Sequence, residues 1–126
     1  MNCEHTTVIM RADAHRLVST CKHGSIHINW DWATLHMNFG DFDRLARLLK
    51  EAGSEPDPPR MKDEGRCGLI RQQNDCYQLW LVNVALFLDP TDFLLFSDLV
   101  INARRRLGQQ QPQPAATTLL RDLGIL

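Results

Sequence analysis

The sequence lacks a long apolar run, a CxxC pair and a glycine-rich loop of the kind that holds a phosphate or an oxyanion. No segment is long and apolar enough to span a bilayer, and the first 18 residues lack the apolar centre of a signal peptide. We therefore expect a cytoplasmic protein with no membrane partner. Its four cysteines are expected to be reduced thiols rather than a disulfide framework.

An excess of charge of either sign is also missing, because 14 Lys and Arg face 15 Asp and Glu for a net charge of −1. Bulk electrostatic attraction to nucleic acid is therefore not expected, and we predict no nucleic-acid partner. Arg104, Arg105 and Arg106 form the one basic run. We place it near the end of a helix, where cations favour the negative end of the helix dipole.

What the sequence does contain is a repeated pattern with an offset of 51 residues. Residues 35–42 align without a gap on residues 86–93, and the hydrophobic pattern stays in phase from Val18 and Leu69 onwards. Identities are few, but a repeat of this kind indicates architecture before any motif does. It also allows each half of the chain to be compared with the other.

In the first unit, alternating apolar and polar residues predict strands within residues 17–21, 26–30 and 33–39. A two-residue loop at Asp31 and Trp32 would place Ile28 opposite Leu35 and His27 opposite His36. A helix follows, capped by Asn38, with one apolar stripe: Phe42, Leu45, Ala46, Leu49 and Ala52.

The second unit has the same order of strands and then a helix that Asp89 caps and that runs to about Leu107. We expect an α+β fold of two tandem βββα repeats that share one antiparallel sheet, with both helices on one face and a short C-terminal helix. The expected segments, within one compact domain, are a loose lead-in (1–15), the first unit (16–53), a linker (54–66), the second unit (67–108), a Gln/Pro tether (109–115) and an amphipathic segment (116–126).

The face of the sheet away from the helices differs between the two units. In the first unit it is polar and rich in histidine, whereas the second unit places Trp80, Val82 and Phe87 there. Aromatic side chains are enriched in the centres of interfaces, so we predict a partner-binding surface made of these residues and Trp32. Two alternatives remain: the C-terminal segment covers this face, or the assignment of the face is wrong.

A second hypothesis concerns the histidines, all five of which lie within the first 36 residues. In the predicted register His27 and His36 form a cross-strand pair, with Cys21 diagonal to them and His23 in the adjoining loop. These four residues could supply ligands for Zn or Cu, although their spacing matches no standard zinc motif. A nucleophilic role for Cys21 is disfavoured, because Asp31 lies too far along the hairpin to orient a histidine base.

These patterns favour a small accessory, assembly or regulatory protein without catalytic activity over an enzyme. Homodimerisation through the apolar face is the simplest version, because isologous dimers are the commonest oligomers. A protein partner other than a second copy is the other version. In this interpretation the protein has no cofactor, and a Zn or Cu ion belongs to the alternative function of metal binding or sensing.

Overall fold

The computed structural model describes residues 6–54, 61–63, 66–72, 74–81 and 84–110. Our expectations for residues 1–5 and for the tether and C-terminal helix beyond residue 110 lie outside the described residues. Within them the fold is α+β, with two antiparallel sheets and two helices.

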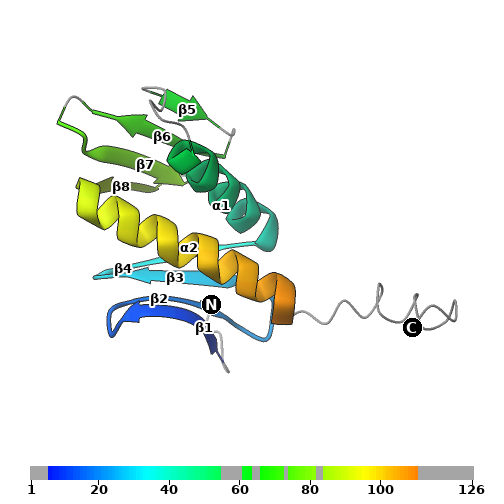
Figure 1. The fold of residues 1–126 in the computed structure, drawn as a ribbon. Coiled ribbons are helices and arrows are strands. Elements are labelled where there is room, and N and C mark those ends of the chain that lie inside the picture. Colours follow the sequence, from blue (N-terminus) through cyan, green and yellow to red (C-terminus); the bar gives the residue numbers. More distant parts are fainter. Residues whose placement is uncertain (1–5, 55–60, 64–65, 73, 82–83, 111–126) are drawn as a thin grey trace, which may run out of the picture.

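The elements follow one another in two runs of four strands and a helix (Figure 1). The first run is β1 (Thr7–Asp13), β2 (Arg16–Thr20), β3 (Ile26–Trp30), β4 (Ala33–Met37) and α1 (Phe39–Ser54). The second run is β5 (Met61–Asp63), β6 (Cys67–Arg71), β7 (Tyr77–Leu81), β8 (Val84–Leu88) and α2 (Pro90–Gln110). We call β1–β2–β3–β4 sheet A and β5–β6–β7–β8 sheet B; neighbouring strands in each are hydrogen-bonded.

The predicted hairpin of the first unit is confirmed, including its register. Ile28 pairs with Leu35 and His27 with His36, and the chain turns at residues 31 and 32. Asp31 adopts a φ of 56°, the left-handed conformation that such two-residue turns require. Gly24, with a φ of 83°, does the same in the loop between β2 and β3.

Both helices begin at the caps that the sequence predicts. The Asp41 amide donates a hydrogen bond to Asn38 Oδ1 (2.7 Å), and the Asp92 amide donates to Asp89 Oδ1 at the same distance. Each cap satisfies an amide that has no partner within its helix. Our prediction that α2 ends near Leu107 was wrong, since the helix continues through Gly108 to Gln110. The three arginines therefore lie before its last turn, which holds no basic residue.

The single shared sheet that we expected is not observed, because sheets A and B are separate four-stranded sheets. The additional strands β1 and β5 lie where we expected a lead-in and a linker. β1 contains two irregularities, between Val8 and Met10 and between Arg11 and Asp13. Each extra residue reverses the alternation of side chains, which conceals the strand in the sequence.

Each helix packs mainly against the sheet of the other run. α1 packs against β5 and β6, α2 packs against β1 and β2, and the two helices pack against each other. One cluster of buried apolar residues joins both sheets and both helices; its largest fully buried members include Phe42, Phe96, Ile28 and Leu79. The two runs thus share one core, as expected for units too small to bury a core of their own.

Equivalent elements begin 51 positions apart: β2 and β6 at 16 and 67, β3 and β7 at 26 and 77, β4 and β8 at 33 and 84, and α1 and α2 at 39 and 90. The pairing registers follow the same offset, so that Ile28 with Leu35 corresponds to Leu79 with Leu86. We call positions that are 51 residues apart equivalent positions.

Candidate functional site

The face of sheet B away from the core carries an exposed aromatic residue. Phe87, on the outer strand β8, is 72% exposed. It pairs with Gln78 on β7, and the next pair on the same face is Trp80 with Ala85. Ala85 is exposed and Trp80 is partly buried. The equivalent pairs in sheet A are His27 with His36 and Asn29 with Thr34, so only sheet B presents an apolar face here.

Trp80 is partly buried because its indole lies over Gly68, its cross-strand neighbour on β6. A Cβ atom at Gly68 would clash with the indole ring. The indole thus covers the backbone of Gly68, which has no side chain to shield it from water, as aromatic residues opposite glycine do in other sheets. Trp80 therefore has a role in packing sheet B, which leaves Phe87 as the most exposed aromatic residue of this face.

The other two predicted partner-binding residues are placed differently. Trp32 is 99% exposed at the β3–β4 turn of sheet A, with its ring 6.4 Å from that of His15. It thus belongs to the other sheet from Phe87 and Trp80. Val82 lies outside the described residues.

The polar face of sheet A is more buried than we expected. Ser19, Cys21 and His27 are each only 6% exposed, whereas His36 is exposed. The rings of His27 and His36 lie 4.2 Å apart, and His27 Nε2 has no hydrogen-bond partner among the described residues. Partial loss of water around the ring, together with the neighbouring His27, lowers the pKa of the His36 imidazole below its ordinary value.

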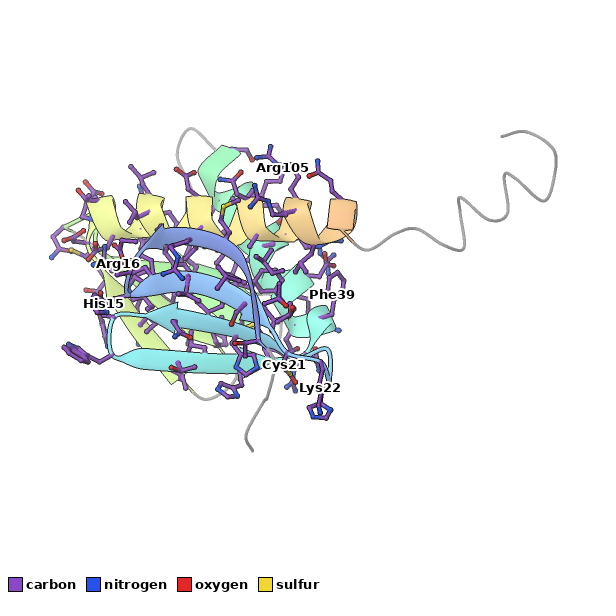
Figure 2. The ribbon with its side chains drawn as sticks, turned by 90° about the horizontal axis from the view of Figure 1, so that it is seen from below. His15, Arg16, Cys21, Lys22, Phe39 and Arg105 are labelled. Atoms are coloured by element: carbon purple, nitrogen blue, oxygen red, sulfur yellow. The ribbon has the colours of Figure 1, made fainter. Side chains whose placement is uncertain are left out.

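The structure brings together two of the four predicted metal ligands. Across the described part of the chain, no group of three or more His, Cys, Asp or Glu side chains is close enough to hold a metal ion. Figure 2 shows Cys21 and Lys22 at the end of sheet A opposite His15 and Arg16. His23, in the same turn as Lys22, is exposed. Of the described residues, the His27–His36 pair alone would therefore have to provide the ligands.

A pocket of about 370 Å3 lies between the two runs of the chain. One wall is formed by β4 and the start of α1, and the other wall is formed by the end of sheet B. Its lining residues are Thr34, Leu35, His36, Met37, Asn38, Asp41, Arg66, Cys67, Leu81 and Val84. This volume falls within the range of small-ligand and peptide-side-chain sites.

An ion pair between the two runs forms the polar side of the pocket. Arg66 Nε donates to Asp41 Oδ1 (2.7 Å) and Arg66 Nη2 donates to Asp41 Oδ2 (3.2 Å), while Arg44 Nη1 donates to Oδ1 (3.1 Å). The hydrogen bonds from Arg66 outweigh the effect of burial and lower the pKa of the Asp41 carboxyl. The carboxylate is therefore charged and compensated at neutral pH.

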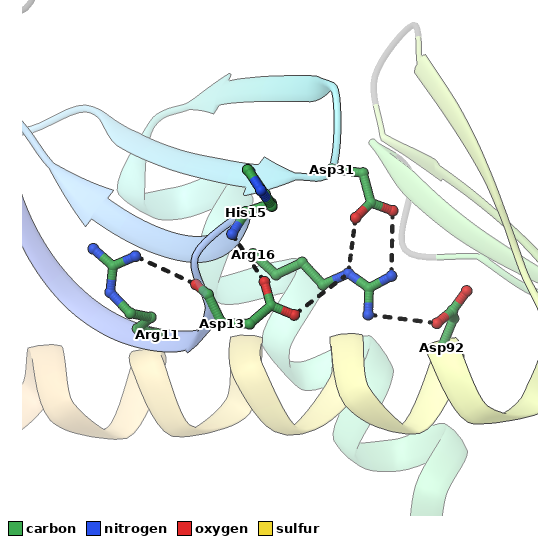
Figure 3. Close-up of polar contacts among 6 residues, drawn as sticks. All are labelled: Arg11, Asp13, His15, Arg16, Asp31 and Asp92. Carbon is green, nitrogen blue, oxygen red and sulfur yellow. Dashed lines mark hydrogen bonds and ion pairs between the residues drawn. The ribbon is translucent and has the colours of Figure 1, made fainter.

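The equivalent place in the first run is filled by side chains. Cys67 and Leu81 of the pocket correspond to Arg16 and Trp30, which are much larger. The Arg16 guanidinium lies 4.6 Å from the centre of a Trp30 ring, and Trp30 packs edge-on against Phe96 (5.0 Å). Figure 3 shows Arg16 surrounded by three carboxylates, from Asp31, Asp13 and Asp92, at 3.0, 4.0 and 3.7 Å.

Sequence reasoning missed the pocket and its ion pair. Asp41 lies at the start of the helix that we predicted after Asn38, and Arg66 is the last residue of the predicted linker 54–66; neither prediction includes the contact between them. A comparison of equivalent positions offered a signal: the pair of residues 15 and 16 is His-Arg, whereas the pair 66 and 67 is Arg-Cys. The arginine has moved by one position between the two runs.

Comparisons with protein-family models, curated proteins and solved structures found no significant match to this chain. Neither of the described helices combines the length and the apolar character needed to cross a membrane.

Proposed function

We propose that this chain is a small accessory, assembly or regulatory protein that acts through protein–protein contact rather than catalysis. The observation that carries the proposal is Phe87, 72% exposed on the face of sheet B. With Trp80 and Ala85 it forms an apolar strip, which we call the Phe87 face. A partner that covers such a strip removes apolar area from water, and aromatic residues contribute strongly to such contacts.

The position of Phe87 on an outer strand supports the proposal. Among the described residues, β8 pairs only with β7, so its other edge is unpaired. Apolar outer strands promote unwanted association unless they are short, charged or covered. β8 has the sequence Val-Ala-Leu-Phe-Leu and carries no charge. A partner that covers the Phe87 face and also reaches this edge would remove the liability.

We further infer that the two runs are a tandem repeat whose second copy acquired the apolar face. The equivalent positions of Trp80, Ala85 and Phe87 are Asn29, Thr34 and His36, all polar. The fold thus tolerates polar residues at these positions. Ala85 and Phe87 of the second copy therefore serve contact rather than folding, whereas Trp80 serves contact and also packs over Gly68. Homodimerisation through this face is the simplest version.

The test compares the wild type with Phe87→Asp, using Leu94→Asp as the matched control. Leu94 is similarly exposed, at 66%, but lies on α2. Light scattering should give a wild-type mass of twice 14.5 kDa, a folded monomer for Phe87→Asp and a dimer for the control. Phe87→Asp is a better probe than a Trp80 variant, since Trp80 also packs over Gly68.

A monomeric wild type would reject the homodimer version. Cross-linking in extract of the source cells would then compare the same three proteins. A partner captured by the wild type and the Leu94→Asp control but not by Phe87→Asp would support the proposal. Equal capture of partners by all three proteins would contradict it.

A second candidate function is metal binding at the first hairpin, with Zn or Cu as the expected ion. The contact between His27 and His36 favours it, as does the lack of a hydrogen-bond partner for His27 Nε2 within the described part of the chain. Two imidazoles are fewer ligands than a structural Zn site requires. Elemental analysis of untagged protein and of His36→Ala tests it: metal below a tenth of an equivalent in both would remove this function.

A further inference from the structure

We infer that the pocket beside β4 holds an extended peptide segment of a protein partner, which adds as a strand to the outer edge of β4. The inference rests on the proposed function, because it names how a partner is recognised. It differs in place, since the pocket and the Phe87 face are lined by different residues. Each can therefore be changed without the other.

The lining of the pocket points to the edge of a strand rather than to one of its faces. Four consecutive residues of β4, from Thr34 to Met37, border it. Successive side chains of a strand point to opposite faces, so only a cavity along the strand edge contacts four in a row. Within the described residues, β4 pairs with β3 alone, and its outer edge has no strand partner.

The register identifies which backbone groups face the pocket edge. Trp30 and Ala33 flank the two-residue turn and form a hydrogen-bonded pair, as in hairpins of this type. Pairs of an antiparallel ladder alternate, so the amides and carbonyls of Thr34 and His36 point away from β3. These groups are the ones that an added strand would use.

The side chains around the edge define the occupant. Leu35, Leu81 and Val84 offer apolar contacts, while Thr34 and His36 lie on the other face of β4. Arg66 uses Nε and Nη2 to hold Asp41, which also accepts from Arg44, so two cations share one carboxylate at this side of the pocket. The fitting ligand is therefore a peptide of alternating apolar and polar residues without a cationic side chain near Arg66.

The residues at the equivalent positions of the first run show why, among the described residues, a pocket is present at the end of sheet B and not at the end of sheet A. At the equivalent positions Arg16 and Trp30 fill the space, and Arg16 bonds to Asp31. A peptide could not enter there without displacing the guanidinium from its carboxylates. Leu81→Trp should therefore close the pocket with a side chain that the equivalent position already accommodates.

The experiment selects a phage-displayed library of random linear heptapeptides on the full-length wild type, on Leu81→Trp and on Phe87→Asp. We expect the wild type and Phe87→Asp to enrich sequences with alternating apolar residues, and Leu81→Trp to enrich none. A synthetic copy of the best peptide should bind about tenfold more weakly when the amides that pair with Thr34 and His36 are N-methylated. This last measurement does not depend on any protein variant.

The inference is overturned by no enrichment on the wild type, by equal enrichment on Leu81→Trp or by binding that N-methylation leaves unchanged. Enriched sequences that match residues 116–126 would overturn it as well, because that segment of the chain would be the occupant. A dimer that Leu81→Trp dissociates would identify a second copy as the occupant instead. Loss of the peptides on Phe87→Asp alone would place recognition on the Phe87 face. Failure of the pocket leaves the light-scattering test of Phe87 unchanged, so the two proposals fail separately.

Discussion

The ends of the two sheets are built from equivalent positions but reach opposite results. Sheet A ends in Arg16, Trp30 and Ala33, where a cation and an indole fill the space beside α2. Sheet B ends in Cys67, Leu81 and Val84, and a pocket of about 370 Å3 remains. Two substitutions in side-chain size thus separate a closed end from an open one on the same backbone plan. The fold sets the place for a site, and side-chain volume decides whether the site exists.

The largest difference in the free energy of unfolding is expected between Trp30→Leu and Leu81→Trp, which exchange the residues at one pair of equivalent positions. Trp30 is only 5% exposed and packs against Phe96, so Trp30→Leu should lower the free energy of unfolding by about 2–4 kcal/mol. Leu81→Trp enters existing space and should change it by less than about 1 kcal/mol. Urea unfolding of both variants measures the difference. Equal losses of unfolding free energy in the two variants would show that the ends of sheets A and B are packed alike, which would contradict the difference described above.

A smaller effect is expected at the centre of sheet B. Gly68→Ala places a methyl group into the Trp80 indole, and overpacking of this kind costs about 1–3 kcal/mol. The equivalent pair in sheet A is Leu17 with Asn29, in which the larger residue lies on the other strand. The double variant Gly68→Ala with Trp80→Asn should recover most of the loss. Thermal unfolding tests this, and no recovery would show that the clash is not the cause.

The two aspartates at the helix starts should differ from each other, and the effect at Asp92 should be the smallest of all. Asp41 is 10% exposed and receives bonds from Arg66 and Arg44, so Asp41→Asn should cost about 1–3 kcal/mol at neutral pH. Asp92, 35% exposed and 3.7 Å from Arg16, should cost below about 1 kcal/mol when changed to Asn. Urea unfolding at pH 7 compares the two variants.

Acid should distinguish the Asp41 ion pair further. The pKa of the Asp41 carboxyl is lowered in the folded state. As the pH falls through the ordinary carboxyl range, the unfolded state therefore binds more protons than the folded state does. The stabilisation by Asp41 is present above that range and is lost as the pH falls through the lowered pKa. The gap between wild type and Asp41→Asn should therefore shrink towards pH 3. A gap that stays constant with pH would contradict this assignment.

Local features of the fold were predictable, and the reasons are local. The register of β3 and β4 follows from a two-residue turn and alternating residues, and both helix caps follow from Asn38 and Asp89. β1 escaped prediction because the chain adds an unpaired residue at Ile9, which disrupts the alternation. The carbonyl of Ile9 accepts a bond from Arg106 on α2 (3.0 Å), a partner 97 residues away.

The candidate sites divide in the same way. The Phe87 face needed only a comparison of two strands, and the exposure of Phe87 agrees with it. The pocket needed the crossing of the helices, which brings Arg66 to Asp41 and the end of sheet B to β4. Contacts of this range depend on tertiary packing that no pattern within one strand or helix records. The burial of His27 was missed for the same reason.

The crossed helices also bear on how the chain is made. A ribosome synthesises β1 and β2 first, yet the helix that packs against them, α2, begins only at Pro90. Until that helix emerges, the apolar face of the first sheet remains uncovered, and nascent apolar surface of this kind is a substrate for chaperones. The second sheet is different, because α1 is complete before β5 and β6 are made. The first run therefore cannot complete its packing until the second run has been synthesised. The shared core can close only when α2 has been translated.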